Sequence, residues 1–201
     1  MILQDSTQNV ATLSNTGGVT SFSIKATAKS FQILSAGLYS NKIKAIVREL
    51  STNALDAHIA IGKAHIPFSV HLPSSMEPYF SVQDYGVGLT EEESTKTGSN
   101  DFVGALGLGS KSPFSYTSNF TITAVKNGIK NIFTAFISDS GVPNIAKMFS
   151  EQTEESSGVE IKFAVDSSSD FHNFANEACN VYKYFKKLSM QLRTWLERPR
   201  G

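Results

Sequence analysis

The chain has 201 residues, 40% of them hydrophobic, and its 18 basic and 18 acidic side chains cancel. This length suits one domain or a domain with an appendage, and the balanced charge gives no support for nucleic-acid binding through phosphate neutralisation. No run approaches the roughly 18 apolar residues of a membrane helix, and the polar N-terminus lacks the apolar stretch of a signal peptide. The lone cysteine, Cys179, cannot form an internal disulfide. These features favour a cytoplasmic protein with no transmembrane segment.

Composition divides the chain into three predicted parts. Residues 1–20 are rich in Ser, Thr, Asn and Gly, which predicts a flexible N-terminal arm. Residues 21–166 hold the periodic segments expected of the main domain. Residues 167–201 read as a C-terminal helical extension.

Hydrophobic periodicity predicts the elements in chain order. The expected strands span residues 21–25, 67–72, 78–83, 120–125, 129–137, 145–149 and 159–165. The expected helices span residues 28–39, 40–61, 106–116 and 170–196. Asn127-Gly128 is the strongest hairpin signal in the chain, and Pro113 indicates that the third helix is short. This order predicts an α+β fold, a two-layer sandwich with a mixed, mostly antiparallel sheet and its helices on one face.

The helix at residues 40–61 carries an apolar stripe. At about 100° per residue, with Glu49 at zero, seven apolar side chains fall between roughly 60° and 160°. They predict the face that packs on the core. These seven are Ile43, Ile46, Val47, Leu50, Ala54, Ala57 and Ile61.

A narrow polar stripe borders the apolar one. Glu49, Asn53 and Asp56 fall at about 0°, 40° and −20°. A glutamate at the edge of a pocket can act as general base, and an asparagine oxygen can bind Mg²⁺. An aspartate there can hold a sugar or an ordered water. A solvated helix edge explains the same three residues, and the stripe taken alone favours that plainer interpretation.

A second polar motif follows the strand expected at residues 78–83. It reads Asp84-Tyr85-Gly86-Val87-Gly88. An aspartate at the end of a strand can be partly buried and accept the exocyclic amino group of adenine. The glycines leave room for a flat base to approach the backbone. Asp and Gly are also the usual turn residues, so this motif alone indicates a plain turn.

The third motif is glycine-rich and runs from Gly104 to Gly109, followed by Ser110, Lys111 and Ser112. Glycines that lead into a helix expose backbone N–H groups, which can bind an anion. The segment is not a P-loop, because Ser110 separates the last glycine from the lysine, and its glycine spacing is the reverse of the Rossmann fingerprint. A flexible hinge is the alternative interpretation.

The three motifs occur in a set order: E-x-x-x-N-x-x-D-A at residues 49–57, D-x-G-x-G at 84–88 and G-x-x-G-x-G at 104–109. In this order they resemble the successive boxes of the GHKL superfamily of ATPases, which includes DNA gyrase B subunits, heat-shock chaperones, histidine kinases and MutL proteins. The resemblance implies the Bergerat fold for residues 21–166. Longer strings at residues 39–50, 94–102 and 107–116 resemble the N-terminal domain of rIIA-type proteins of tailed bacteriophages.

The resemblance implies a role for each matched residue, with ATP and Mg²⁺ as ligands. Glu49 matches the general base, Asn53 the magnesium ligand, and Asp56 a residue near the ribose and phosphates. Asp84 matches the aspartate that reads adenine. The remaining implied nucleotide-binding residues are Gly86, Gly88, Thr95, Lys96, Gly104, Leu106, Gly107, Leu108, Gly109, Ser110 and Lys111.

The chain departs from the GHKL pattern in three places. The stretch between Gly88 and Gly104 is shorter than the ATP lid of many relatives. Val159 stands where many relatives have a threonine whose hydroxyl supports the adenine aspartate. Relatives also continue into a second domain that supplies a cation to the γ-phosphate, so residues 167–201 are expected to be truncated relative to the family.

The sequence leaves three functions open. The first is a Mg²⁺-dependent ATP-binding domain with slow or conditional hydrolysis, and the second is a phage interaction or structural protein whose pocket no longer hydrolyses. The third is a phosphotransferase of the histidine-kinase type, for which no dimerisation helix pair with a phospho-acceptor histidine is evident. His58 and His65 are interpreted as solvated or structural.

The resemblance also implies partners and a location. It implies a homodimer formed on ATP binding, a phage or host protein as partner, and the cytoplasm of an infected bacterium, peripherally at the membrane. The polar arm at residues 1–20 is the segment expected to exchange between the two copies of such a dimer.

Overall fold

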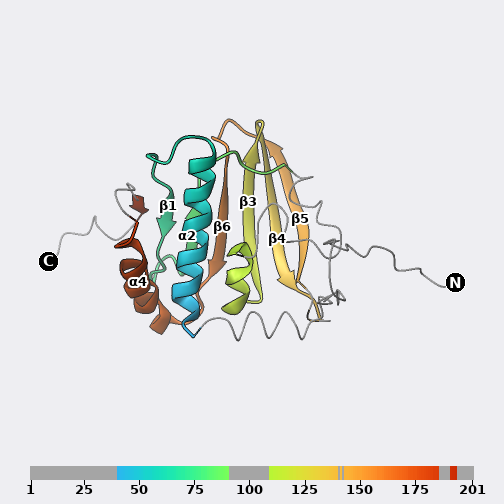
Figure 1. Cartoon of the computed structure of the whole chain (residues 1–201). Helices are drawn as coiled ribbons and strands as arrows, with labels where there is room; N and C mark the ends of the chain where they lie inside the picture. Colours follow the sequence, from blue (N-terminus) through green and yellow to red (C-terminus); the bar gives the residue numbers. More distant parts are fainter. Residues whose placement is uncertain (1–39, 91–108, 140, 142, 186–190, 194–201) are drawn as a thin grey trace, which may run out of the picture.

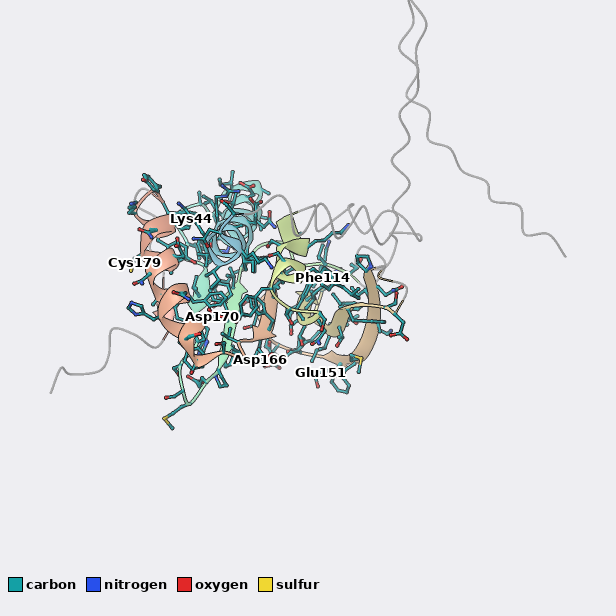
Figure 2. The ribbon with its side chains drawn as sticks, turned by 90° about the horizontal axis from the view of Figure 1, so that it is seen from below. Lys44, Phe114, Glu151, Asp166, Asp170 and Cys179 are labelled. Carbon is teal, nitrogen blue, oxygen red and sulfur yellow. The ribbon has the colours of Figure 1, made fainter. Side chains whose placement is uncertain are left out.

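The fold has two layers, a single sheet and a layer of helices on one of its faces. Figure 1 shows helices α2 and α4 and the 3₁₀ helix η1 in front of the sheet, and in Figure 2 they form one layer over the strands. The computed structural model describes residues 40–90, 109–139, 141, 143–185 and 191–193. The expected arm at residues 1–20, strand at 21–25 and helix at 28–39 lie outside the described residues. The predicted two-layer α+β sandwich is confirmed.

The sheet has seven strands in the order β5-β4-β3-β6-β2-β1-β7. Neighbouring strands are antiparallel except β1 and β7, which run parallel. The sheet is therefore mixed and mostly antiparallel, as predicted. The strands are β1 (Ser69–His71), β2 (Tyr79–Gln83), β3 (Asn119–Lys126), β4 (Ile129–Ile137), β5 (Pro143–Gln152), β6 (Gly158–Ala164) and β7 (Gln191–Arg193).

The hairpin between β3 and β4 forms where the sequence predicts it. Asn127 and Gly128 have φ values of 54° and 72°, the left-handed conformation that a two-residue hairpin turn requires at both positions. Lys126 pairs directly with Ile129. Every second residue of β3 then faces the helices and is buried, namely Phe120, Ile122 and Ala124.

Helix α2 (Lys42–Ala60) is the central element of the helical layer. Its first turn is capped by the Asn41 side chain, which accepts a hydrogen bond from the Lys44 amide at 3.0 Å. The helix ends before Gly62, whose φ of 70° suits glycine. Four members of the predicted apolar stripe are buried in the core, Ile46, Val47, Leu50 and Ala54.

Helix α4 (Ser168–Tyr182) closes the core beside α2. Its fully buried Phe174 packs against Phe80 of β2 and Phe163 of β6, with ring centroids 4.9 Å and 6.1 Å away. The hydroxyls of Ser51 and Tyr182 lie 2.8 Å apart and join α2 to the end of α4. The aromatic contacts thus attach α4 to the sheet.

The expected helix at residues 170–196 is wrong in its second half. Helix α4 ends at Tyr182, and Gln191–Arg193 form β7, which pairs with β1. The expected helix at residues 106–116 is represented by η1 (Gly109–Ser115), a 3₁₀ helix that contains Pro113. No helix in these described parts of the chain is long and apolar enough to cross a membrane.

Replacing Phe174 with alanine should destabilise the fold by about 3–5 kcal/mol, because it leaves a cavity beside the two buried rings of Phe80 and Phe163. His172 is exposed on the same helix, so His172→Ala should change stability by less than about 0.5 kcal/mol. Urea denaturation of both variants tests this, and equal free energies of unfolding would show that α4 does not belong to the core.

Candidate functional site

The polar stripe of α2 lies at the edge of the buried core, with different exposure along its length. The Glu49 side chain is 28% exposed, whereas Asn53 and Asp56 are exposed. Arg48 binds Glu49 from the preceding position, its Nη2 and Nε atoms donating to Oε1 at 2.7 Å and 3.2 Å. Both bonds end on Oε1, so Oε2 can still accept a proton or a hydrogen bond. Because Arg48 is 57% exposed, the pair holds the carboxylate weakly.

The carboxyl group of Asp84 is buried directly after β2. Its Oδ1 atom accepts hydrogen bonds from the backbone N–H groups of Gly86 at 2.8 Å and Val159 at 3.3 Å. Burial raises the pKa of Asp84 above its ordinary value, and the two backbone donors oppose this shift in pKa. Both bonds end on Oδ1, which leaves Oδ2 able to accept a further hydrogen bond.

Val159 supports Asp84 through its backbone. Asp84 donates its own N–H to the Val159 carbonyl oxygen at 2.9 Å, and Val159 returns a hydrogen bond to Oδ1. The valine side chain has no hydrogen-bond donor, so it is the backbone of Val159 that supports the carboxylate.

Three glycines bring the loop after β2 against its neighbours. A Cβ atom on Gly86 would stand 2.9 Å from the Cβ of Ala57 on α2. One on Gly88 would stand 1.8 Å from the Val125 carbonyl oxygen, and one on Gly158 would stand 2.1 Å from the Asp84 carbonyl oxygen. Because Ala57 follows Asp56 directly and lies one turn after Asn53, the Asp84 loop sits beside the polar stripe.

His58 of α2 forms a hydrogen bond with the backbone of the same loop. It is 1% exposed, and its Nε2 accepts the backbone N–H of Tyr85 at 2.7 Å while Nδ1 bonds the Ile66 carbonyl oxygen at 2.8 Å. The structural interpretation of His58 is confirmed and the solvated one excluded, whereas His65 is exposed. His58 falls at about 180° on the helical wheel, just past the apolar stripe. This position could have predicted that His58 is buried, but not which groups it bonds.

Most of the predicted phosphate-binding residues lie outside the described residues. These are Thr95, Lys96, Gly104, Leu106, Gly107 and Leu108. The backbone of Gly109 and Ser110 begins η1, and Lys111 within it is half-buried. Helix η1 packs on the same face of the sheet beside α2 (Figure 1). A single cavity shared by these residues and Asp84 therefore stays a prediction.

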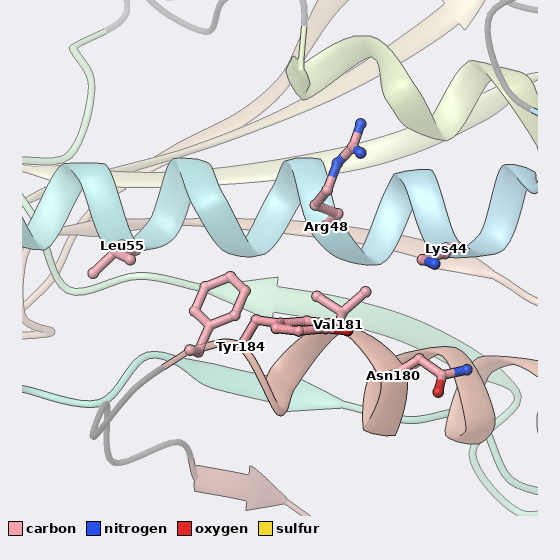
Figure 3. Close-up of a pocket in the computed structure, with 7 residues that line it drawn as sticks. Lys44, Arg48, Leu55, Asn180, Val181 and Tyr184 are labelled. Carbon is pink, nitrogen blue, oxygen red and sulfur yellow. The ribbon is translucent and has the colours of Figure 1, made fainter.

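A groove of about 420 Å³ opens on another side of α2. Figure 3 shows it between Lys44, Arg48 and Leu55 of α2 and the last turn of α4. The α2 residues that line the groove lie near 240° on the helical wheel, about 120° from the Glu49 stripe. The groove is therefore separate from the loop of Asp84. It is completed by Asn180, Val181, Tyr184 and Phe185.

One comparison with known proteins finds a local similarity. A stretch of 49 residues is 41% identical to pyruvate dehydrogenase (acetyl-transferring) kinase 1, mitochondrial, of Saccharomyces cerevisiae. The stretch covers 23% of this chain and 12% of that kinase, so the chain spans a small part of this relative's length. No family model matches the chain. The similarity is to a kinase of the GHKL superfamily and covers one short segment of the chain.

The described geometry can bind a flat polar ring. A buried carboxylate with one oxygen left to accept suits a ligand with an amino group on an aromatic edge. The exposed oxygens of Asn53 and Asp56 stand on the adjacent helix. They suit hydroxyl groups, waters and hard cations.

Gly88→Ala should destabilise the protein by about 3 kcal/mol or more, because the new Cβ would overlap the Val125 carbonyl. Gly62 is the matched control, since its φ of +70° is close to the +69° of Gly88 but a Cβ there meets nothing within 4 Å. Gly62→Ala should therefore cost only about 1–2 kcal/mol. Equal free energies of unfolding for the two variants would show that the loop does not touch β3.

Proposed function

We propose that this chain is a Mg²⁺-dependent adenine-nucleotide-binding domain of GHKL type that hydrolyses ATP slowly or conditionally. The observation that carries the proposal is the Asp84 carboxylate. It is 9% exposed, anchored through Oδ1 by two backbone N–H groups, and set beside the polar stripe of α2. The order of the three sequence motifs and the local similarity to a GHKL kinase support it.

Asp84 would read the base. Adenine presents an exocyclic amino group, a hydrogen-bond donor that Oδ2 can accept in a largely apolar surrounding. Ordering by Gly86 and Val159 lets the carboxylate meet the base without first losing side-chain entropy. Gly86 and Gly88 would act indirectly, because their lack of side chains lets the loop pack against Ala57 and Val125 and so fixes the position of the carboxylate.

The polar stripe would face the triphosphate. Asn53 offers a neutral oxygen of the kind that Mg²⁺ accepts alongside phosphate oxygens and water. The described residues hold no cluster of three His, Cys, Asp or Glu side chains able to bind a metal by themselves, so the ion would share its ligands with the nucleotide. When bound, Mg²⁺ would neutralise phosphate charge.

Glu49 would activate water. Its carboxylate takes a proton as the water oxygen attacks the γ-phosphorus, the bond from phosphorus to the β–γ bridging oxygen breaks, and ADP and phosphate leave. A cation beside the γ-phosphate would stabilise the negative charge of the transition state further. In proteins of the GHKL superfamily that the sequence motifs resemble, a second domain supplies this cation.

The strings at residues 39–50, 94–102 and 107–116 support an rIIA-type phage protein, with a phage or host partner, a dimer formed on ATP binding, and action in the infected cytoplasm. The alternative function is a phage interaction protein whose pocket binds nucleotide without hydrolysis. The Arg48 contact on Glu49 favours this alternative, because it occupies one oxygen of the proposed base.

Asp84→Asn should weaken ATP binding about a hundredfold or more, because the amide turns a donor toward the adenine amino group. The free energy of unfolding of this variant should not be lower than that of the wild type at pH 7. Burial raises the pKa of Asp84 in the folded state, so the ionised carboxylate costs stability as the pH rises through that pKa, and asparagine removes the cost. Calorimetric titration with ATP and Mg²⁺ measures the affinity, and urea denaturation the stability.

Asp139→Asn is the matched control, because Asp139 is exposed in the loop between β4 and β5. It should bind ATP as the wild type does. An Asp84→Asn protein that keeps wild-type affinity for ATP would remove the adenine assignment.

Glu49→Gln should lower the rate of phosphate release about a hundredfold or more while leaving ATP affinity within a few-fold of wild type, because only the proton acceptor is lost. Glu155→Gln is the control, since Glu155 binds Lys130 far from α2. Phosphate release by the wild type at the rate of Glu49→Gln, with ATP binding intact, would favour the non-hydrolysing alternative.

A further inference from the structure

We propose that His58 is the positioning residue of the adenine site, a neutral imidazole that clamps the Asp84 loop onto α2 and makes nucleotide affinity sensitive to pH. This inference rests on the proposed function. It assigns a role to a histidine that touches neither the base nor the phosphates.

The two partners of His58 determine its protonation state. The Tyr85 N–H can only donate, so Nε2 must accept and carries no proton. The Ile66 carbonyl can only accept, so Nδ1 must carry the proton. The ring is therefore neutral and in the Nδ1–H form. An imidazolium would turn an Nε2–H toward the Tyr85 N–H and lose that bond.

The clamp acts on the loop that carries the base-reading carboxylate. Tyr85 lies between Asp84 and Gly86, and its N–H is held at 2.7 Å from His58 Nε2. The next N–H, of Gly86, donates to Asp84 Oδ1. Releasing Tyr85 would therefore free the backbone on which the carboxylate depends. A second tie, between the hydroxyls of Tyr85 and Ser69 at 2.8 Å, holds the far end of the tyrosine side chain and not its backbone.

Few charged groups surround the ring. Asp84 and Tyr85 face it from the loop after β2, and their side chains are buried and half-buried. Lys63 and His65 lie in the exposed turn that leads to Ile66. Protonating His58 breaks the Tyr85 bond, so the state that binds nucleotide excludes the proton. Nucleotide affinity should then fall when His58 is protonated.

Two substitutions separate the two bonds. His58→Asn places an amide near the Nδ1 position, where it can still donate to Ile66 but cannot reach Tyr85. His58→Gln places an amide oxygen near the Nε2 position, where it can still accept from Tyr85. At pH 8, we expect His58→Asn to weaken ATP binding about tenfold, because a buried N–H loses its acceptor, and His58→Gln to stay within about threefold of wild type.

The pH profile tests positioning against mere packing. Between about pH 8 and pH 5.5, wild-type affinity should fall more steeply than that of His58→Gln. The glutamine variant keeps Asp84 and does not titrate at position 58, so any fall it shows comes from other titrating groups, such as Asp84 and the phosphates of the nucleotide. Ser69→Ala, which removes the other tie on Tyr85, should keep the wild-type shape. Wild-type and His58→Gln profiles of the same shape would overturn the inference, as would equal losses in the Asn and Gln variants.

Two measurements on the nucleotide-free wild type keep the test independent of variant folding and of ATP binding. Long-range ¹H–¹⁵N spectra should show His58 protonated at Nδ1 alone, and hydrogen exchange should show a protected Tyr85 amide. A proton on Nε2 or a fast-exchanging amide would overturn the clamp whatever the protein binds. If both hold but the wild type binds no adenine nucleotide, the proposed function fails, and the role of His58 in affinity fails with it.

Discussion

Backbone contact at three glycines holds the loop after β2 between α2, β3 and β6, and the candidate site depends on it. Gly86 lies against α2, Gly88 against the carbonyl of Val125 and Gly158 against the backbone of Asp84. Close-packed interiors transmit such contacts, so the loop cannot approach any of these elements more closely unless that element moves too. The main chain therefore places the Asp84 carboxylate beside the polar stripe of α2.

The same arrangement lets one buried carboxylate keep a free oxygen. Gly86 and Val159 donate to Oδ1, and His58 holds the intervening Tyr85 from the helix side. A buried carboxylate without donors would favour its protonated form more strongly. With these donors the group is an oriented acceptor, which is the property that a base-reading residue requires. The groove between α2 and α4 has no part in this, because it opens on another side of the helix.

Patterns within short stretches of the sequence predicted most of the fold. The part that they missed depends on pairing between segments that are distant in the sequence. The hairpin at Asn127-Gly128 and the helix with its apolar stripe depend on residues near one another in sequence, so turn chemistry and periodicity suffice. The helix expected at residues 170–196 failed in its second half, because Gln191–Arg193 pair with Ser69–His71. A strand of three residues is too short to show a period of its own, and its partner lies more than a hundred residues earlier.

For the candidate site, the sequence by itself determined which side chains share a motif: a carboxylate, an amide and a second carboxylate on one helix stripe, and an aspartate followed by two glycines. Only the tertiary structure decided that Asp84 is buried, that the backbone of Val159 supports it, and that His58 bonds the Tyr85 amide and the Ile66 carbonyl. The physical reason is that the residue type alone fixes which chemical groups a side chain carries. Burial, protonation state and hydrogen-bond partners depend on which distant backbone atoms the fold brings within 3 Å or so.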